Sequence, residues 1–186
     1  MLTHSLSWEK KTQGVPLYHF DLLQLLPVPL DPTKLKYTLP LPSSNCEKWS
    51  LAEDFAIFHM GSGSSDKDWP EEYWRKLAEM AANQRQIVFT GRGSIESERI
   101  KRVITGLSGA LDLSNQLDWK ELCTVIAAAS QVITVDSVVA HLAEAYSIPS
   151  IVIFMGPSDP LHWKPPHATG LFRPLPEQVF LKIACE

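Results

Sequence analysis

A buried-strand pattern that breaks into a loop of small residues constrains this chain more than any other feature. An apolar run with one histidine, His59, covers positions 55–60. Glycine and serine fill 61–65, and Lys67 stands shortly before Trp69 and Pro70. Proline suits the first turn of a helix, so a helix is expected from Pro70. Small residues let backbone N–H groups approach an anion, and Lys67 adds a positive charge. The stretch therefore predicts a phosphate-binding loop.

A second strand end has the same character. A strand pattern over 132–135 is followed by Asp136 and by a helical pattern over 137–146 that begins with Ser137. In one interpretation, Asp136 only caps that helix. In the other, the free N–H groups of Ser137, Val138 and Val139 bind a diphosphate, and the Ser137 hydroxyl adds a donor. The two interpretations are compatible.

Strand and helix patterns alternate throughout the middle of the chain. We expect strands at 55–60, 86–90, 110–113, 132–135 and 150–154, and helices at 70–83, 94–107, 118–129 and 137–146. Such alternation predicts an α/β fold with a doubly wound parallel sheet, Rossmann-like, in which ligands bind beyond the carboxyl ends of the strands. Both candidate phosphate loops follow strands and are expected at that edge.

The two flanks of the chain are rich in proline. Positions 1–50 contain one amphipathic helical pattern, at 19–26, and are otherwise expected to be extended. After the last expected strand, a tight turn over 156–160 explains Ser158 and Asp159 sufficiently. Asp159, His162 and His167 are expected in a proline-rich loop without the spacing of metal ligands, so no metal site is predicted.

Composition excludes several classes of protein. The net charge of −4 and the pI of about 5.9 do not indicate a nucleic-acid surface. No apolar run approaches the ~20 residues that cross a membrane. Positions 1–8 lack the basic start and apolar centre of a secretory signal. The three cysteines, Cys46, Cys123 and Cys185, are scattered, which favours reduced thiols in a cytoplasmic protein.

Taken together, the two loops resemble the pattern of glycosyltransferase family 9, the bacterial heptosyltransferases. Its motifs are His-Pro-Gly-small, then Lys-x-Trp-Pro, and later Asp-Ser/Thr-Gly-x-x-His. The residues that match are His59, Gly61, Ser62, Lys67, Trp69, Pro70, Asp136, Ser137 and His141. The resemblance runs over about 55–160, and the paired motifs are fairly specific. The chain departs from the pattern at Met60, where the family has proline, and at Val138, where it has glycine.

The resemblance implies one half of a GT-B-type two-domain glycosyltransferase. Positions 51–186 would form the carboxyl-terminal nucleotide-sugar-binding domain, and 1–50 the linker and remnant of the amino-terminal domain. The implied donor is ADP-heptose, without a metal or other cofactor, and the implied acceptor is the lipopolysaccharide core. Transfer would be inverting, with a base from the amino-terminal domain, which would be a separate partner. The implied location is cytoplasmic, with peripheral association at the inner membrane as a further expectation.

Alternatives to an active transferase remain open. A chain without the first domain is expected to be inactive alone, so it could be a non-catalytic nucleotide-sugar-binding module or an inactive remnant. A nicotinamide-dependent oxidoreductase is disfavoured because Glu96 replaces the third glycine of the fingerprint that Gly91 and Gly93 begin.

The predicted donor-binding residues combine both loops with Glu96. They are Gly61, Ser62, Gly63, Lys67, Glu96, Asp136, Ser137, Val138 and His141, with His59, Ser158 and Asp159 as weaker candidates. By resemblance Glu96 accepts hydrogen bonds from nucleoside hydroxyls, although a plain first-turn charge is the alternative. Lys67 could instead be a surface lysine, and His141 a core histidine. The charged residues at 98–102 are expected to form a solvated helix face, and Trp119 to be a helix core or rim residue.

Overall fold

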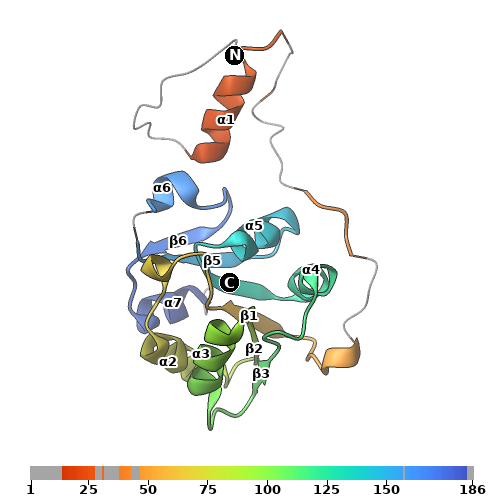
Figure 1. Ribbon diagram of the computed structural model, residues 1–186, viewed down its shortest axis with the longest axis vertical. Helices are drawn as coiled ribbons and strands as arrows, with labels where there is room; N and C mark the ends of the chain where they lie inside the picture. The colour runs from red at the N-terminus through yellow and green to blue at the C-terminus, as the bar shows by residue number, and fades with distance from the viewer. Residues whose placement is uncertain (1–13, 28–30, 32–37, 43–46, 157, 184–186) are drawn as a thin grey trace.

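The fold is a six-stranded, fully parallel sheet with helices on both faces (Figure 1). This computed structural model describes residues 14–27, 31, 38–42, 47–156 and 158–183. The strand order is β3-β2-β1-β4-β5-β6. The strands are β1 (Phe55–His59), β2 (Gln86–Thr90), β3 (Ala110–Asp112), β4 (Gln131–Val135), β5 (Ser150–Phe154) and β6 (Thr169–Phe172). The predicted doubly wound α/β fold is therefore confirmed.

Most helices follow strands and cover the sheet, whereas the first helix precedes the first strand. The helices are α1 (Val15–Leu23), α2 (Glu71–Ala81), α3 (Ser94–Ile104), α4 (Trp119–Ala128), α5 (Val138–Ala145), α6 (Pro160–Trp163) and α7 (Pro176–Ile183), with short 3-10 turns η2 (Glu47–Trp49) and η3 (Ser65–Lys67). Helices α2, α3 and α7 pack on one face of the sheet, and α4 and α5 pack on the other. Apolar surface is thus removed from water on both sides.

Strand β1 shows how the sequence specifies two cores. Ala56 and Phe58 face the core under α2 and α3, whereas Phe55 and Ile57 face the core under α4 and α5. Alternate side chains of a strand point to opposite faces, so a strand buried on both sides is apolar at most positions. This is why β1, β4 and β5 are mainly apolar, with the few polar residues His59, Gln131, Thr134 and Ser150.

The order of the strands reverses between β1 and β4. Strand β1 pairs in parallel with β2 on one side and with β4 on the other, so the connections leave these two strands in opposite directions. A crevice opens at such a switch point, beyond the carboxyl ends of the strands. The loop after β1 carries Lys67, and the loop after β4 carries Asp136 and Ser137. The topology therefore places both predicted phosphate loops at the crevice.

The expectation of a proline-rich loop around Asp159, His162 and His167 is wrong in part. That stretch contains α6, and the edge strand β6 and α7 follow it. Pro160 and Pro176 are the first residues of α6 and α7, a position where the missing N–H is not needed. Helix α1 likewise begins at Val15 rather than at His19, with a proline in its first turn.

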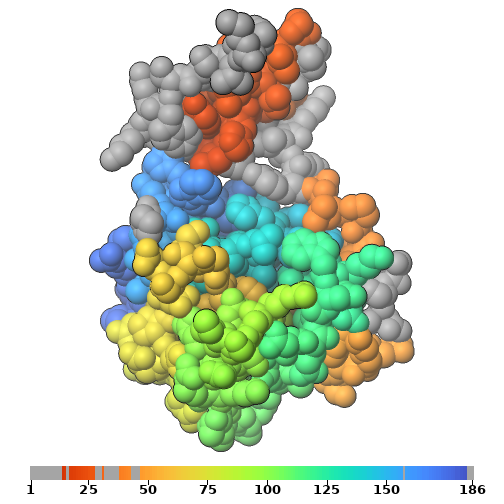
Figure 2. Space-filling model, in the orientation of Figure 1, coloured from red at the N-terminus to blue at the C-terminus, as the bar shows by residue number. Residues whose placement is uncertain are grey.

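Before position 47, the described residues form one helix, α1. Helix α1 lies beyond α6 and β6, away from the edge formed by β3 (Figures 1 and 2). Much of the predicted linker over 1–50 lies outside the described residues, as do Cys46 and Cys185, and the domain boundary at 50 stays a prediction. Cys123 is a buried free thiol in α4. Within the described ranges, none of the helices is long and apolar enough to span a bilayer.

Candidate functional site

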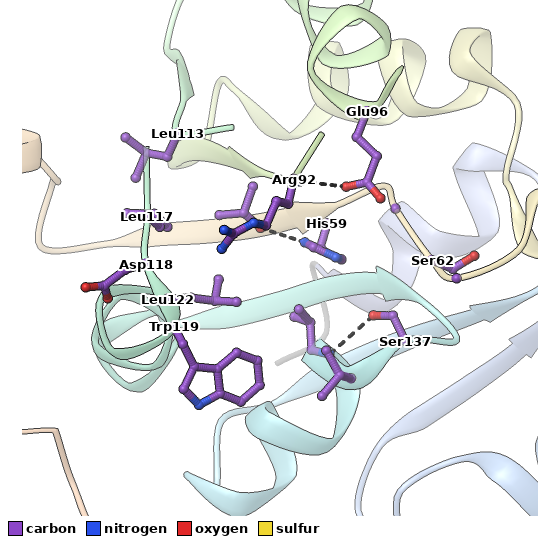
Figure 3. Close-up of a pocket in the computed structure, with 16 residues that line it drawn as sticks. His59, Ser62, Arg92, Glu96, Leu113, Leu117, Asp118, Trp119, Leu122 and Ser137 are labelled. Carbon is purple, nitrogen blue, oxygen red and sulfur yellow. Dashed lines mark hydrogen bonds between the residues drawn. The ribbon is translucent and has the colours of Figure 1, made fainter. Parts of the chain in front are cut away.

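A cavity of about 370 Å³ lies at the switch point (Figure 3). It is bounded by the residues that follow β1, β2 and β3, and by the first turns of α4 and α5. Its lining residues are His59, Gly61, Ser62, Gly63, Thr90, Gly91, Arg92, Glu96, Leu113, Leu117, Asp118, Trp119, Leu122, Ser137, Val138 and Val139. The cavity therefore joins an apolar wall to a polar rim.

The apolar wall comes from the β3–α4 connection and from α4. Leu113, Leu117 and Leu122 line it, and the indole of Trp119 covers one side (Figure 3). Trp119 is 54% exposed, so it is a rim residue and not a core residue. A capping box fixes the start of this helix, since Asp118 accepts the N–H of Glu121 and Glu121 accepts that of Asp118. Such a wall suits a flat apolar group, for example a nucleobase.

His59 is the last residue of β1 and lines the cavity. Its Nδ1 lies 2.9 Å from the hydroxyl oxygen of Thr90 on the neighbouring strand. Burial lowers the pKa of His59 to about 4, against a smaller opposing effect of hydrogen bonding with Thr90. The ring is therefore neutral at physiological pH and offers neutral hydrogen-bonding groups.

Glu96 links the loops that follow β1 and β2. Its Oε2 accepts the backbone N–H of Arg92 at 2.9 Å, and its carboxyl group fills the space beside Gly61. A Cβ at Gly61 would lie 2.0 Å from the Glu96 Cδ, so only glycine fits there while Glu96 keeps its place. Glu96 thus lies on the cavity wall, where the predicted hydroxyl contact stays a prediction.

Ser137, not Asp136, caps α5. The Ser137 hydroxyl oxygen accepts the Val139 N–H at 3.3 Å and lies 3.0 Å from the hydroxyl of Thr134. The interpretation of Asp136 as the cap is therefore wrong. The Val139 N–H already has a partner, which removes one of the three predicted donors. Val138, the first residue of the helix, is 53% exposed and lines the cavity.

Asp136 instead pairs with the lysine of the other loop. The Lys67 Nζ lies 2.7 Å from the Asp136 Oδ2, and the carboxylate is mostly buried. Neither residue lines the cavity itself. The ion pair stands next to the cavity, close to the start of α5, because Asp136 directly precedes the cap residue Ser137. The structure thus brings the two predicted loops together.

The loop between Gly61 and Pro70 is well anchored. Gly156 packs against the backbone carbonyl of Asp66, with room for no side chain there. The indole of Trp69 is buried and donates to the Pro174 carbonyl oxygen at 3.0 Å. Arg99 binds Asp68, so the predicted solvated face at 98–102 is wrong for this arginine, whose side chain is only 12% exposed.

Other predicted residues lie away from the cavity. His141 is partly buried in α5 and is not among the lining residues. Ser158 is also outside, and Asp159 accepts the Leu161 N–H as the cap of α6. His162 lies near Asp159, whereas His167 binds Glu144 at the opposite end of α5. No cluster of three or more His, Cys, Asp or Glu side chains suited to a metal occurs in the part of the chain that the structure describes.

Sequence reasoning missed much of the cavity wall. Thr90, Arg92 and Trp119, and the leucines of the β3–α4 connection, were not predicted as site residues, yet they line the cavity. Their position in the sequence could have indicated them, since most of them follow the carboxyl ends of β2 and β3, where ligands of such sheets bind. Asn115 supports this wall through a backbone in the left-handed region and an acceptor oxygen 2.7 Å from the Gly93 nitrogen.

The sequence is similar to characterised heptosyltransferases. It is 32% identical over 110 residues to lipopolysaccharide heptosyltransferase 1 of Escherichia coli (strain K12), covering 59% of this chain and 34% of the relative. It is 36% identical over 131 residues to the protein of the same name in Pseudomonas aeruginosa, covering 65% and 36%. The chain thus spans about a third of the length of these curated relatives.

Solved structures agree in fold. The E. coli heptosyltransferase WaaC with ADP superposes with a TM-score of 0.62 at 27% identity, covering 70% of this chain and 43% of that one. A family 9 glycosyltransferase from Veillonella parvula superposes with a TM-score of 0.71 over 97% of this chain and 54% of its own, at 19% identity, which supports the fold alone.

The sequence profile of glycosyltransferase family 9 (heptosyltransferase) matches residues 3–172. The match extends beyond the predicted 55–160 at both ends and includes most of the amino-terminal segment. The strand order and the two loops at the switch point agree with this match. The chain belongs to glycosyltransferase family 9.

Proposed function

We propose that this chain binds a nucleoside diphosphate sugar, ADP-heptose, at the switch point of its sheet. One observation carries the proposal: an apolar cavity ends at the first turn of a helix, and beside that turn stands a lysine held by an ion pair. An adenosine diphosphate has the matching polarity, since a flat base is followed by a ribose and then by two anionic phosphates. A similar protein, the E. coli WaaC, has been solved with ADP.

The nucleoside would occupy the cavity. The base would lie against Trp119 and the leucine wall, where apolar burial and stacking stabilise a purine. Glu96 would accept hydrogen bonds from the ribose hydroxyls, since its carboxylate sits on the polar rim. Its position is fixed by the Arg92 N–H.

The diphosphate would extend from the cavity toward Lys67. Ser62, Ser137 and the start of α5 lie along that path, and backbone N–H groups at a helix start favour anions. When the sugar departs, negative charge grows on the diphosphate, and fixed donors and a cation stabilise it. We propose that these groups serve without a metal.

The reaction we propose is inverting transfer of heptose to an acceptor sugar of the lipopolysaccharide core, at the cytoplasmic side of the inner membrane. A base must deprotonate the acceptor hydroxyl before it displaces ADP. Among the described cavity residues, His59 is bonded to Thr90 and Glu96 to the Arg92 N–H, so we assign neither as this base. We propose that a separate amino-terminal domain supplies it. Purified chain given ADP-heptose and a deacylated core acceptor should then release no ADP above background, and clear turnover would contradict this.

A non-catalytic binding module or inactive remnant with a weakened donor site is the second candidate. It is favoured by Val138, whose side chain stands at the cavity where the family pattern has glycine. A valine at this place narrows the approach of a diphosphate to the start of α5. The module hypothesis predicts donor binding without transfer even when a family 9 amino-terminal domain is added in trans.

Calorimetric titration tests the proposed function. ADP and ADP-heptose should bind with a single site per chain, AMP should bind more weakly because it lacks the phosphate nearest Lys67, and UDP should bind more weakly because a pyrimidine fills less of the apolar wall. Equal affinity for AMP and ADP, or binding of neither, would overturn the proposal.

A further inference from the structure

The turn that carries Lys67 is held in place through the residues on either side of the lysine, Asp66 and Asp68. The backbone of Asp66 packs on Gly156, and the side chain of Asp68 binds Arg99. The turn itself has only two internal backbone hydrogen bonds, from the N–H groups of Lys67 and Asp68 to the carbonyl oxygens of Ser64 and Ser65. A single turn of this kind is not stable alone, so its position depends on these outer contacts.

Arg99 makes the charged outer contact. Its Nη1 lies 2.6 Å from the Asp68 Oδ2, and its Nη2 lies 3.4 Å from the Trp69 carbonyl oxygen. Its Nε lies 3.3 Å from the Glu71 Oε1. The guanidinium therefore reaches three consecutive parts of the chain: the residue after Lys67, the next carbonyl, and the first turn of α2.

The surroundings make this contact specific for arginine. The Arg99 side chain is 12% exposed, and a planar group with several donors in fixed directions can bind these acceptors together, whereas a lysine offers one point charge. Burial raises the pKa of Asp68, while the charge and hydrogen bond of Arg99 act in the opposite direction. Without Arg99, the Asp68 carboxylate would lose the cation that supports its charged form.

We propose that Arg99 is a positioning residue for the donor diphosphate, acting through the turn that aims Lys67. This inference rests on the proposed function, because Lys67 is taken to meet the phosphates. Arg99 of α3 binds Asp68, and Gly156, which follows β5, packs against Asp66. The Lys67 ammonium itself forms an ion pair with Asp136. The lysine is thus fixed at its backbone and at its charged end.

The plain alternative is that Arg99 only joins α2 to α3. Arg102 provides the matched control for that role, since it lies one turn further along α3 and binds Glu71 through two hydrogen bonds. The Arg102 side chain is 58% exposed, and its bonds go to α2 and not to the turn. Arg99→Met and Arg102→Met therefore remove similar links between the helices, and only the first removes the link to Asp68.

Hydrogen–deuterium exchange of the unliganded chain tests the positioning directly. Arg99→Met should speed amide exchange over 64–68 by about tenfold, while Arg102→Met should leave that segment unchanged. Asp68→Asn, which keeps α3 intact, should reproduce the effect and guards against a folding defect in the arginine variant. Equal exchange over 64–68 in the two arginine variants would overturn the proposal.

Calorimetry with ADP tests the connection to Lys67. Arg99→Met should weaken ADP binding by about tenfold, and should have no further effect in a Lys67→Ala background. Adenosine, which has no phosphate, should bind the parent and Arg99→Met equally. Additive losses in the double variant, or a matching loss of adenosine binding, would mean that Arg99 does not act through Lys67.

The two proposals fail in different ways. If the parent chain binds no ADP, the proposed function fails, and the exchange comparison alone decides whether Arg99 positions the turn. If the parent binds ADP and Arg99→Met binds it as tightly as Arg102→Met does, the positioning role fails and the proposed function stands.

Discussion

The Nζ atom of Lys67 lies 2.7 Å from the Oδ2 atom of Asp136. This ion pair connects the loop after β1 to the end of β4, the two strands between which the strand order reverses. Asp136 thereby holds the ammonium next to the first turn of α5, where an anionic ligand is favoured. A diphosphate at this point would share the lysine with Asp136 and would also gain the donors of the helix start.

Replacing Lys67 by alanine should weaken ADP binding by ~10- to 150-fold, because a charge-assisted hydrogen bond is worth ~1.5–3 kcal/mol. The fold should persist, although the buried Asp136 carboxylate loses its partner. Calorimetry measures the affinity, and thermal unfolding reports the stability. Lys67→Ala/Asp136→Asn removes the unpaired charge, so it should recover stability without recovering ADP affinity.

Lys76→Ala is the matched control, since Lys76 forms an exposed ion pair with Glu177 on α2 and α7, away from the cavity. It should bind ADP like the parent. If Lys67→Ala also binds ADP like the parent, Lys67 is only a surface residue with an ion pair.

Replacing Val138 by glycine should tighten ADP binding. The valine side chain is half exposed and lines the cavity at the first turn of α5, so its removal opens the approach to that turn. The change should also lower helix stability by up to about 1 kcal/mol. Affinity and melting temperature are measured on the same samples.

The backbone at Val138 narrows the possible causes of this effect. Val138 has ordinary helical geometry and is absent from the residues with positive φ in the described ranges, so a backbone need for glycine is excluded there. The expected gain in ADP affinity would therefore come from removing the volume of the valine side chain. Unchanged or weaker ADP binding by Val138→Gly would mean that the valine does not hinder the ligand.

His59 should make the stability of the chain depend on pH. Its pKa is about 4 in the folded chain and near 6.5 when unfolded, so the unfolded state binds more protons between these values. Stability should therefore fall as the pH drops from about 6.5 to 4, by about 1 to 3 kcal/mol, since the cavity admits some solvent to the ring. Denaturant unfolding from pH 7 to 4 measures this.

The variant His59→Gln provides the comparison for the pH series, because it cannot titrate. Its stability should decline less over the same range, and the difference between the two curves isolates His59 from the other titrating groups. Parallel curves for the parent and the variant would show that the histidine is not held neutral by burial.

Replacing Gly61 by alanine should displace Glu96 from the cavity. The new Cβ would lie within 2.2 Å of the Glu96 carboxyl atoms, and that end of a flexible side chain can move, so stability should change by less than about 1 kcal/mol. ADP affinity should fall, but not in a Glu96→Ala background, where the space is free. Calorimetry on the four proteins of this cycle gives the coupling.

Ser64→Ala serves as the control for this loop, since the Ser64 side chain is exposed and does not line the cavity. It should bind ADP like the parent. A loss of affinity from Gly61→Ala that persists without the Glu96 carboxyl would mean that the new methyl group obstructs the ligand itself and does not act by displacing Glu96.

The strands and helices of the sheet were predictable because each carries a local signal. Strand β1 is buried on both faces and is therefore apolar from Phe55 to Phe58. Asp118 and Glu121 form a capping box whose residues are close in sequence. The carboxyl-terminal elements were not predictable in this way. Strand β6 is a short edge strand without a buried pattern, and the prolines near α6 and α7 indicate loops as much as helix starts.

The site was predictable as two loops but not as a set of contacts. Sequence spacing shows that Lys67 and Asp136 each follow a strand, and the topology rule brings the loops together. Neither the spacing nor the topology rule shows that Lys67 and Asp136 form an ion pair. Neither shows that Ser137, and not Asp136, is the N-cap of α5. Arg99 looked like a solvated charge because its partner Asp68 lies 31 positions away in the chain. Contacts of this range depend on the packing of α3 against the loop.

A crystal structure of the chain with ADP would decide whether the cavity at the switch point is the donor site. We expect the adenine against Trp119 and the leucine wall, the ribose beside Glu96, and the terminal phosphate within hydrogen-bonding distance of the Lys67 Nζ. ADP bound elsewhere, for example beside Glu144 and His167 at the opposite end of α5, or a cavity that stays empty at saturating ADP, would contradict this assignment.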